Sequence, residues 1–248
     1  MADMEVKAAG QTKAIPEPTL RRLPIYHQYL KRMHEEKKLE FISCTQIGND
    51  LSILPIQVRK DLQIADAVGK PKTGYSLEEL IGIIEDFLGW NNTTDAYVVG
   101  VGNLGAALLG YGGFNECGLN IVAGFDVNEQ KIDREIGGKK ILNISKLPDM
   151  IKRMGIKIGI LTVPASAAQE IADIMIKAGI HAIWNFSPVK IAVPSDVIVQ
   201  HENLASTLGV LSKKLALAMK AKAGNERDVP PNGKPADIMG ENSVKRGE

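Results

Sequence analysis

The stretch Ala96-Tyr97-Val98-Val99-Gly100-Val101-Gly102-Asn103-Leu104-Gly105 decides the fold of this chain. Its apolar start predicts a short β-strand, and its glycines have the spacing G-x-G-x-x-G that leads from a strand into a helix. In this pattern the first glycine allows a tight turn, the second lets the backbone approach a pyrophosphate, and the third lets the helix pack closely. The helix N-terminus favours anions, so the stretch predicts a dinucleotide site.

An acidic residue strengthens this interpretation. The run Ile121-Val122-Ala123-Gly124-Phe125-Asp126 predicts the next strand, and its final carboxylate can accept hydrogen bonds from a ribose 2′-hydroxyl. The pattern therefore favours NADH/NAD over the phosphorylated dinucleotides, although the nearby Lys131 and Arg134 weaken that distinction. A glycine turn without a ligand is the alternative.

Two further strands complete the prediction of a parallel sheet. One spans residues 157–163 and the other residues 181–186, with a helix from Ala165 to Ala178 between them. Ligands of open parallel sheets lie beyond the carboxyl ends of the strands. We therefore expect cofactor contacts where these two strands end, or else simple termination of the strands by proline. The expected contacts are Thr162, Val163, Pro164, Asn185, Phe186 and Ser187.

Composition limits the class of protein. The 248 residues include two cysteines and four histidines without metal-ligand spacing, and the chain carries a net charge of +1. These features exclude a disulfide framework and a cysteine-rich zinc site, and they predict no metal. The lack of a long apolar run and of a signal-like start predicts a cytoplasmic protein without a membrane segment.

The chain divides into five expected parts. These are a mobile arm (1–17), a helical domain (18–88), the sheet domain (89–200), a final helix (201–222) and a disordered tail (223–248). The arm lacks periodicity, and the tail combines prolines, glycines and charges that cannot bury a core.

The helical domain has the pattern of a helix-turn-helix. Ser43 or Thr45 can cap a short helix, and Pro55 opens a helix whose inner side carries Val58, Leu62 and Ala65. Its outer side is polar and basic, as a recognition helix in the major groove requires. The outer residues are Gln57, Arg59, Lys60 and Gln63.

A glycine-bounded basic turn at residues 69–75 then suggests the wing of a winged helix. Residues 21–72 contain ten basic and six acidic side chains, which predicts a positive patch. The alternative is a helical interaction bundle with solvated charges. The expected contacts with double-stranded DNA are Arg21, Arg22, Gln57, Arg59, Lys60, Gln63, Lys70 and Lys72.

The residues expected of an enzyme are missing. A nicotinamide dehydrogenase needs an acid–base group beside the hydride and a pocket for its substrate. The predicted strands end in short apolar loops, and no Tyr-x-x-x-Lys pair is present. We therefore expect no catalytic residues, and a dinucleotide that is sensed and not consumed.

Taken together, these motifs resemble those of the Rex family of NADH/NAD-responsive transcriptional repressors. The resemblance covers about residues 16–220, and the joint occurrence of its segments is more specific than any one motif. These segments include Gln57-Val58-Arg59-Lys60-Asp61-Leu62, Leu161-Thr162-Val163-Pro164 and Asn185-Phe186-Ser187-Pro188. It implies a homodimer that binds a palindromic DNA operator and is released by NADH, with NAD competing. It also implies a nicotinamide pocket near Tyr111, and DNA contacts from Arg59, Lys60 and the wing.

Two segments of the helical domain depart from the family pattern, as does Glu202-Asn203 before the final helix, where an Asp followed by an aromatic or apolar residue is expected. Residues 63–68 read Gln-Ile-Ala-Asp-Ala-Val where the family has a Ser-Tyr-Phe-Gly type run, and the wing lacks the usual Arg-Gly pair. The operator sequence is therefore not predicted.

The final helix carries an apolar stripe at helical spacing. The stripe favours a dimerisation helix that the resemblance implies is exchanged between subunits, although packing on its own domain would give the same pattern. Its residues are Leu204, Leu208, Leu211, Leu215 and Met219.

The predicted fold class is thus α/β: an N-terminal winged helix-turn-helix domain, a Rossmann-type parallel-sheet dinucleotide-binding domain and a C-terminal dimerisation helix. The glycine loop of the second domain is expected to bind the cofactor through Gly100, Val101, Gly102, Asn103, Leu104 and Gly105. The main alternatives are an NAD-dependent oxidoreductase with an N-terminal helical oligomerisation domain, and a module that binds CoA or another nucleotide.

Overall fold

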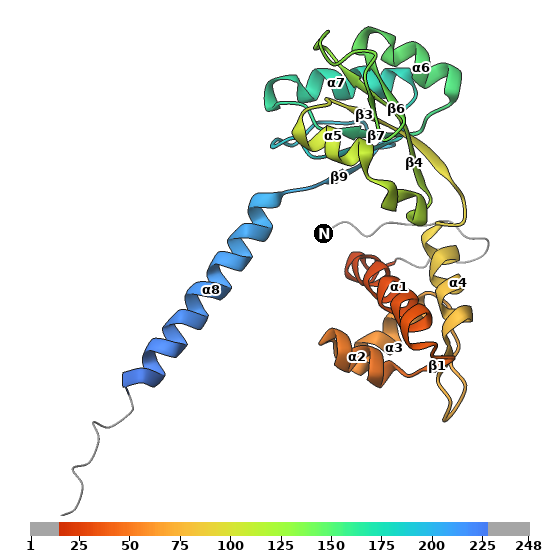
Figure 1. Ribbon diagram of the computed structural model, residues 1–248, viewed down its shortest axis with the longest axis vertical. Helices are drawn as coiled ribbons and strands as arrows, with labels where there is room; N and C mark the ends of the chain where they lie inside the picture. Colours follow the sequence, from red (N-terminus) through yellow and green to blue (C-terminus); the bar gives the residue numbers. More distant parts are fainter. Residues whose placement is uncertain (1–14, 228–248) are drawn as a thin grey trace, which may run out of the picture. The chain divides into compact units, whose positions relative to one another are not determined.

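The computed structural model describes residues 15–227, in two compact units that divide after His201. Most of the expected arm and the end of the expected tail, residues 1–14 and 228–248, lie outside the described residues. Figure 1 shows the described elements of both units.

The N-terminal part of the first unit consists of helices and a small two-stranded sheet. The long helix α1 contains Pro24 in its interior, and Ser43 caps α2 by accepting a hydrogen bond from the Gln46 N–H. Pro55 opens α3, as its fixed φ angle favours. The elements are α1 (Glu17–Lys37), β1 (Phe41–Ile42), α2 (Cys44–Leu51), α3 (Pro55–Ile64), β2 (Tyr75–Ser76) and α4 (Leu77–Leu88).

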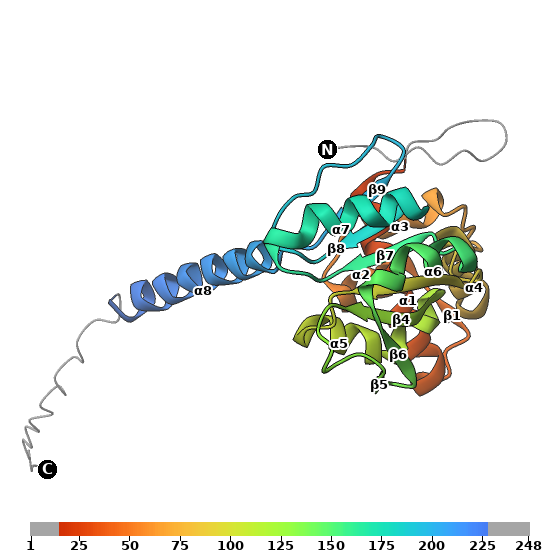
Figure 2. The same ribbon diagram turned by 90° about the horizontal axis from the view of Figure 1, so that it is seen from above.

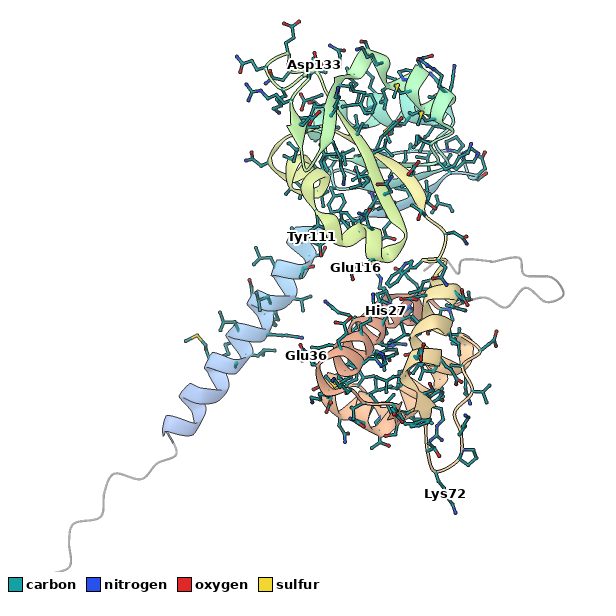
Figure 3. All side chains as sticks on the ribbon, turned by 45° about the vertical axis from the view of Figure 1, so that its right-hand side comes forward. His27, Glu36, Lys72, Tyr111, Glu116 and Asp133 are labelled. Carbon is teal, nitrogen blue, oxygen red and sulfur yellow. The ribbon has the colours of Figure 1, made fainter. Side chains whose placement is uncertain are left out.

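A hairpin projects between α3 and β2. Lys70 and Gly74 form an antiparallel bridge across its base, and β1 pairs with β2. Lys72 lies at its tip with a positive φ of 66° and points away from the helices (Figure 3). Helix-turn-helix and hairpin together form the predicted winged helix.

A seven-stranded sheet forms the rest of this unit, within residues 94–201. Its order is β5-β6-β4-β3-β7-β8-β9, and all pairs are parallel except β5 with β6. The strands are β3 (Thr94–Val99), β4 (Leu119–Asp126), β5 (Glu135–Ile136), β6 (Lys139–Asn143), β7 (Ile158–Leu161), β8 (Ala182–Asn185) and β9 (Ile198–His201).

Helices cover both faces of this sheet, as Figure 2 shows from above. On one face α6 (Leu147–Met154) and α7 (Ala165–Ala178) enclose a core around Tyr97 and Phe125. On the other face α5 (Asn103–Gly110) packs Leu109 against Val98 and Ile160. The two short 3₁₀ helices are η1 (Gly112–Cys117) and η2 (Ile144–Lys146). This layering is the predicted doubly wound α/β arrangement.

The second unit contains one long helix, α8 (Leu204–Arg227), which continues past the expected end at residue 222. The stripe residues whose side chains are described are exposed: Leu208, Leu211, Leu215 and Met219. In the part of the chain that the structure describes, no helix is long and apolar enough to span a bilayer.

Candidate dinucleotide cleft and nucleic-acid interface

A cleft of about 500 Å³ lies at the carboxyl ends of the central strands. Strand β3 lies between β4 and β7. After β3 the strand order runs outward through β4 and β6 on one side, and then continues through β7, β8 and β9 on the other, so the strand order reverses at this point. Ligands of open α/β sheets bind at such a point. The lining residues are Gly100, Gly102, Asp126, Val127, Lys131, Ile144, Thr162, Val163, Pro164, Ala167, Ile171, Phe186 and Pro188.

The three fingerprint glycines differ in what surrounds them. A Cβ at Gly100 would lie 2.8 Å from the Thr162 carbonyl oxygen, and one at Gly105 only 2.0 Å from the Gly100 oxygen. Gly102, in contrast, has nothing within 4 Å of its Cβ position. It is also the N-cap of α5, which has no side-chain cap hydrogen bond. The open space and the uncapped helix end fit a phosphate group there.

Asp126 is buried beside this loop, and three donors engage it. Its Oδ2 accepts hydrogen bonds from the Val101 N–H at 2.8 Å and from the Lys131 Nζ at 3.2 Å. Its Oδ1 accepts from the Asn128 N–H at 2.8 Å, and Lys131 also donates to the Val101 carbonyl at 2.8 Å. A carboxylate offers about four acceptor positions, so acceptor capacity remains for one ribose hydroxyl.

The two strand exits are held by their own side chains. The Thr162 hydroxyl donates to the Gly100 carbonyl at 2.6 Å, and the Ser187 hydroxyl donates to the Val163 carbonyl at 2.8 Å. The buried Asn185 side chain accepts from the Ser187 N–H and donates to the Val189 carbonyl, both at 2.9 Å. Asn185 and Ser187 therefore support the wall of the cleft, while Thr162, Val163, Pro164 and Phe186 line it.

Tyr111, expected near the nicotinamide, is not among the residues that line the cleft. It is exposed and begins a row of ring contacts through Phe114 and Trp184 to Phe186, with centroid separations of 4.9, 5.6 and 4.8 Å. Figure 3 shows Tyr111 beside the segment that carries Glu116. Only the last ring of this row, Phe186, reaches the cleft.

Several residues that line the cleft are not predicted from the sequence. Val127, Ile144, Ala167, Ile171 and Pro188 are apolar and are not among the expected cofactor contacts, although Pro188 ends the family segment at residues 185–188. Val127 and Ile144 directly follow the carboxyl ends of β4 and β6, and that position is the only sequence signal they carry. Of the fingerprint, Val101 is buried, Gly105 packs against the loop, and Asn103 and Leu104 are exposed on α5.

A second hollow, of about 780 Å³, lies between α3 and the wing. It brings together four of the predicted DNA contacts: Arg59 and Gln63 from α3, and Lys70 and Lys72 from the hairpin. Cys44 and Tyr75 also line it, and burial together with the hydrogen bond that the Tyr75 hydroxyl donates to Cys44 raises the pKa of Tyr75. Lys60 is exposed on α3 outside the hollow.

The two faces of α3 separate as predicted. Val58 and Leu62 are fully buried, and Ala65 just beyond the helix is almost so. Arg59, Lys60 and Gln63 are exposed on the opposite side. This helix can therefore pack on the core while presenting donors to a nucleic acid.

Three residues expected to contact DNA donate hydrogen bonds to carboxylates of the protein itself. The buried carboxylate of Asp61 accepts two hydrogen bonds from Arg22, at 2.6 and 2.8 Å, and one from the Gln57 amide at 2.9 Å. Arg21 donates to Glu17, four residues earlier. Arg22 thus joins α1 to α3, and Gln57 donates to the same carboxylate from within α3.

Thr19 and Tyr26 complete the set of donors to Asp61, at 2.9 and 2.8 Å. Burial by itself raises the pKa of this carboxyl, but the hydrogen bonds from Arg22, Tyr26, Gln57 and Thr19 outweigh it, and the pKa is lowered. Burial and the same carboxylate raise the pKa of Tyr26. Asp61 is therefore a charged anchor inside the helical domain, which sequence reasoning missed because its partners lie up to 42 residues away.

Neither site carries a metal-binding cluster, since no group of three or more His, Cys, Asp or Glu residues suited to a metal occurs among residues 15–227.

Two family profiles match the chain. One, described as "Putative DNA-binding protein N-terminus", covers residues 14–63 and thus contains α1, α2 and most of α3. The other, described as "CoA binding domain", covers residues 91–189 and thus the cleft. The chain is also similar to proteins named "Redox-sensing transcriptional repressor Rex". The one from Treponema denticola is 48% identical, with 85% of this chain and 96% of that protein covered. The one from Bacteroides fragilis is 41% identical, with 85% and 95% covered.

Solved structures agree with these relatives. The chain is similar to the protein RSP, described as a Rex-family repressor, at 32% identity. Its complex with β-NAD⁺ and operator DNA has a TM-score of 0.78, with 88% of this chain and 100% of that chain covered. Its complex with β-NADH has a TM-score of 0.77, with 86% and 99% covered.

Proposed function

Because this chain belongs to the Rex family of redox-sensing transcriptional repressors, we propose that it binds a palindromic operator as a homodimer and releases it when NADH binds, with NAD competing. Membership makes the chain a regulator and not an enzyme.

One observation carries the DNA part of the proposal. Arg59 and Gln63 of α3 meet Lys70 and Lys72 of the wing around a single hollow. Arginine and glutamine can form paired hydrogen bonds with base edges, whereas lysine neutralises phosphates. We propose that Arg59, Gln63 and the exposed Lys60 face the major groove, and that the wing lysines contact the backbone.

The dinucleotide part of the proposal places NADH or NAD in the cleft. The pyrophosphate would lie over Gly102 at the uncapped N-terminus of α5, and a ribose hydroxyl would use the remaining acceptor position of Asp126. Lys131 would flank that ribose, and the nicotinamide would lie toward Phe186. The similar protein solved with β-NAD⁺ and with β-NADH favours this ligand over CoA.

The homodimer couples the two sites. Recognition helices of a two-fold dimer enter successive major grooves about 34 Å apart, so a ligand that changes their separation changes DNA affinity. Such couplings are typically about 1–3 kcal/mol. We propose that NADH favours the arrangement that does not fit DNA, and that the protein works in the cytoplasm, where its operator lies.

The experiment is a fluorescence anisotropy titration on a duplex that the protein selects from random DNA, with NADH and NAD added separately. NADH should lower the affinity for DNA, and added NAD should restore it. Equal effects of both dinucleotides, or none, would overturn the sensing proposal.

Variants can test DNA binding by α3 separately from NADH binding in the cleft. Arg59→Ala should weaken DNA binding at least about fivefold and leave NADH affinity unchanged, because it removes a contact worth about 1–3 kcal/mol outside the cleft. Arg153→Ala is the matched control, since Arg153 is an exposed arginine on α6. If Arg59→Ala binds DNA like the control, α3 is not the recognition helix.

A further inference from the structure

The exposed face of α3 carries one large apolar residue, Ile56. Ile56 is 56% exposed, although a large apolar side chain on a short helix of a folded domain normally packs. Isolated exposed apolar residues are common and need no explanation by themselves. Its position among the neighbouring side chains is what distinguishes Ile56.

Ile56 lies on the same face as the basic and polar side chains. Arg59, Lys60 and Gln63 follow it by three, four and seven residues, which is the spacing of one helical face. All three are exposed, while Val58 and Leu62 on the opposite face are buried. Ile56 is therefore one turn nearer the N-terminus of α3 than Arg59, and the N-terminal residues of a recognition helix are those that contact base edges.

The chemistry of the major groove offers one apolar feature to such a side chain, the 5-methyl group of thymine. We propose that Ile56 is a specificity-determining residue that contacts a thymine methyl group in each half-site of the operator. This proposal rests on the proposed function of α3 as the recognition helix. Polar neighbours fix the register on the duplex, and Ile56 then favours thymine over the other bases at one position.

The test replaces thymines by deoxyuridines, one position at a time, in a duplex that the wild-type protein has selected. Deoxyuridine keeps the base pair and removes only the methyl group. Replacing the sensitive thymine in one half-site should lower the affinity for DNA about fourfold. Burying a methyl-sized group is worth about 0.8 kcal/mol, and 1.4 kcal/mol corresponds to tenfold. Replacing both symmetric positions should lower affinity about 15-fold, since two such losses combine.

The variant Ile56→Ala closes the thermodynamic cycle. It should bind the thymine duplex less tightly than wild type and no longer distinguish thymine from deoxyuridine at the sensitive position, with unchanged NADH affinity. Leu54→Ala is the matched control, because Leu54 is 72% exposed just before α3 and off the face that carries Arg59. The control should keep the full preference for thymine.

Two results would overturn the proposal while leaving the repressor function intact. In one, the wild-type protein binds its selected duplex but is insensitive to every deoxyuridine. In the other, Ile56→Ala keeps the same preference for thymine as wild type. A wild-type protein that selects no duplex at all contradicts the proposed function itself, so the two failures are distinguishable.

Discussion

Gly102 and Gly105 share a motif but differ in why each must be glycine. A Cβ at Gly105 would overlap the Gly100 carbonyl oxygen, which is backbone and cannot move away cheaply. A Cβ at Gly102 would enter open space, and the φ of −74° at Gly102 is accessible to alanine. Gly105 is thus required by the fold, and Gly102 by the proposed ligand.

We therefore expect the two alanine variants to behave differently. Gly105→Ala should lower the thermal midpoint of unfolding and abolish NADH binding, because the loop must shift to relieve the overlap. Gly102→Ala should keep the wild-type midpoint and lower NADH affinity at least tenfold, because the methyl group occupies the approach of the pyrophosphate. Thermal melts and NADH fluorescence titrations measure both effects. Unaltered NADH affinity in Gly102→Ala would place the pyrophosphate elsewhere.

Helices α1 and α3 are joined by the charged anchor at Asp61. Because the lowered pKa lies below the ordinary value of 3.8, the anchor contributes its full stability above pH 3.8. Its contribution is lost as the pH falls through the pKa of the folded state. Breaking a buried, hydrogen-bonded ion pair typically costs about 3–5 kcal/mol, because the remaining partners lose their counter-charge.

Asp61→Asn should accordingly lower the free energy of unfolding at neutral pH by about 3 kcal/mol, and its deficit relative to wild type should shrink in acid. Urea melts between neutral and acidic pH measure this difference. Asp149→Asn is the control, since Asp149 forms an exposed pair with Arg153 and should change stability by less than about 1 kcal/mol. A deficit that stays constant down to acidic pH would show that Asp61 is not charged in the folded protein.

The same elements show what sequence patterns can predict. Periodicity and capping residues are local, so the positions of α3 and of the glycine loop could be predicted, as could the burial of Val58 and Leu62. Contacts between distant segments could not. Arg22 looks like a surface arginine in the sequence, yet Asp61, 39 residues away, holds it inside the helical domain. The apolar wall of the cleft is missed for the same reason, because Ile144 and Ile171 meet only after the sheet is assembled.

At the scale of the whole molecule, the apolar residues of α8 have no other described element of their own unit to pack against. Leu208, Leu211, Leu215 and Met219 are each about 60% exposed. Burying a leucine completely is worth roughly 1.5–3 kcal/mol, so such a stripe favours association with a second copy. The proposed homodimer supplies this cover, and the two recognition helices then act together on a two-fold operator.

Substitutions on the stripe should therefore break the dimer without unfolding the protomer. We expect the double variant Leu211→Lys, Leu215→Lys to sediment as a monomer at concentrations where wild type is a dimer, because each lysine places a charge in the buried contact. It should also lose operator binding at least 100-fold, since one half-site no longer assists the other, while NADH still binds. The control is Lys213→Ala, Lys214→Ala, which changes exposed residues of the same helix off the stripe and should remain dimeric. If the leucine variant sediments and binds DNA as wild type does, α8 is not the dimerisation helix, and the two recognition helices must be held together by another surface.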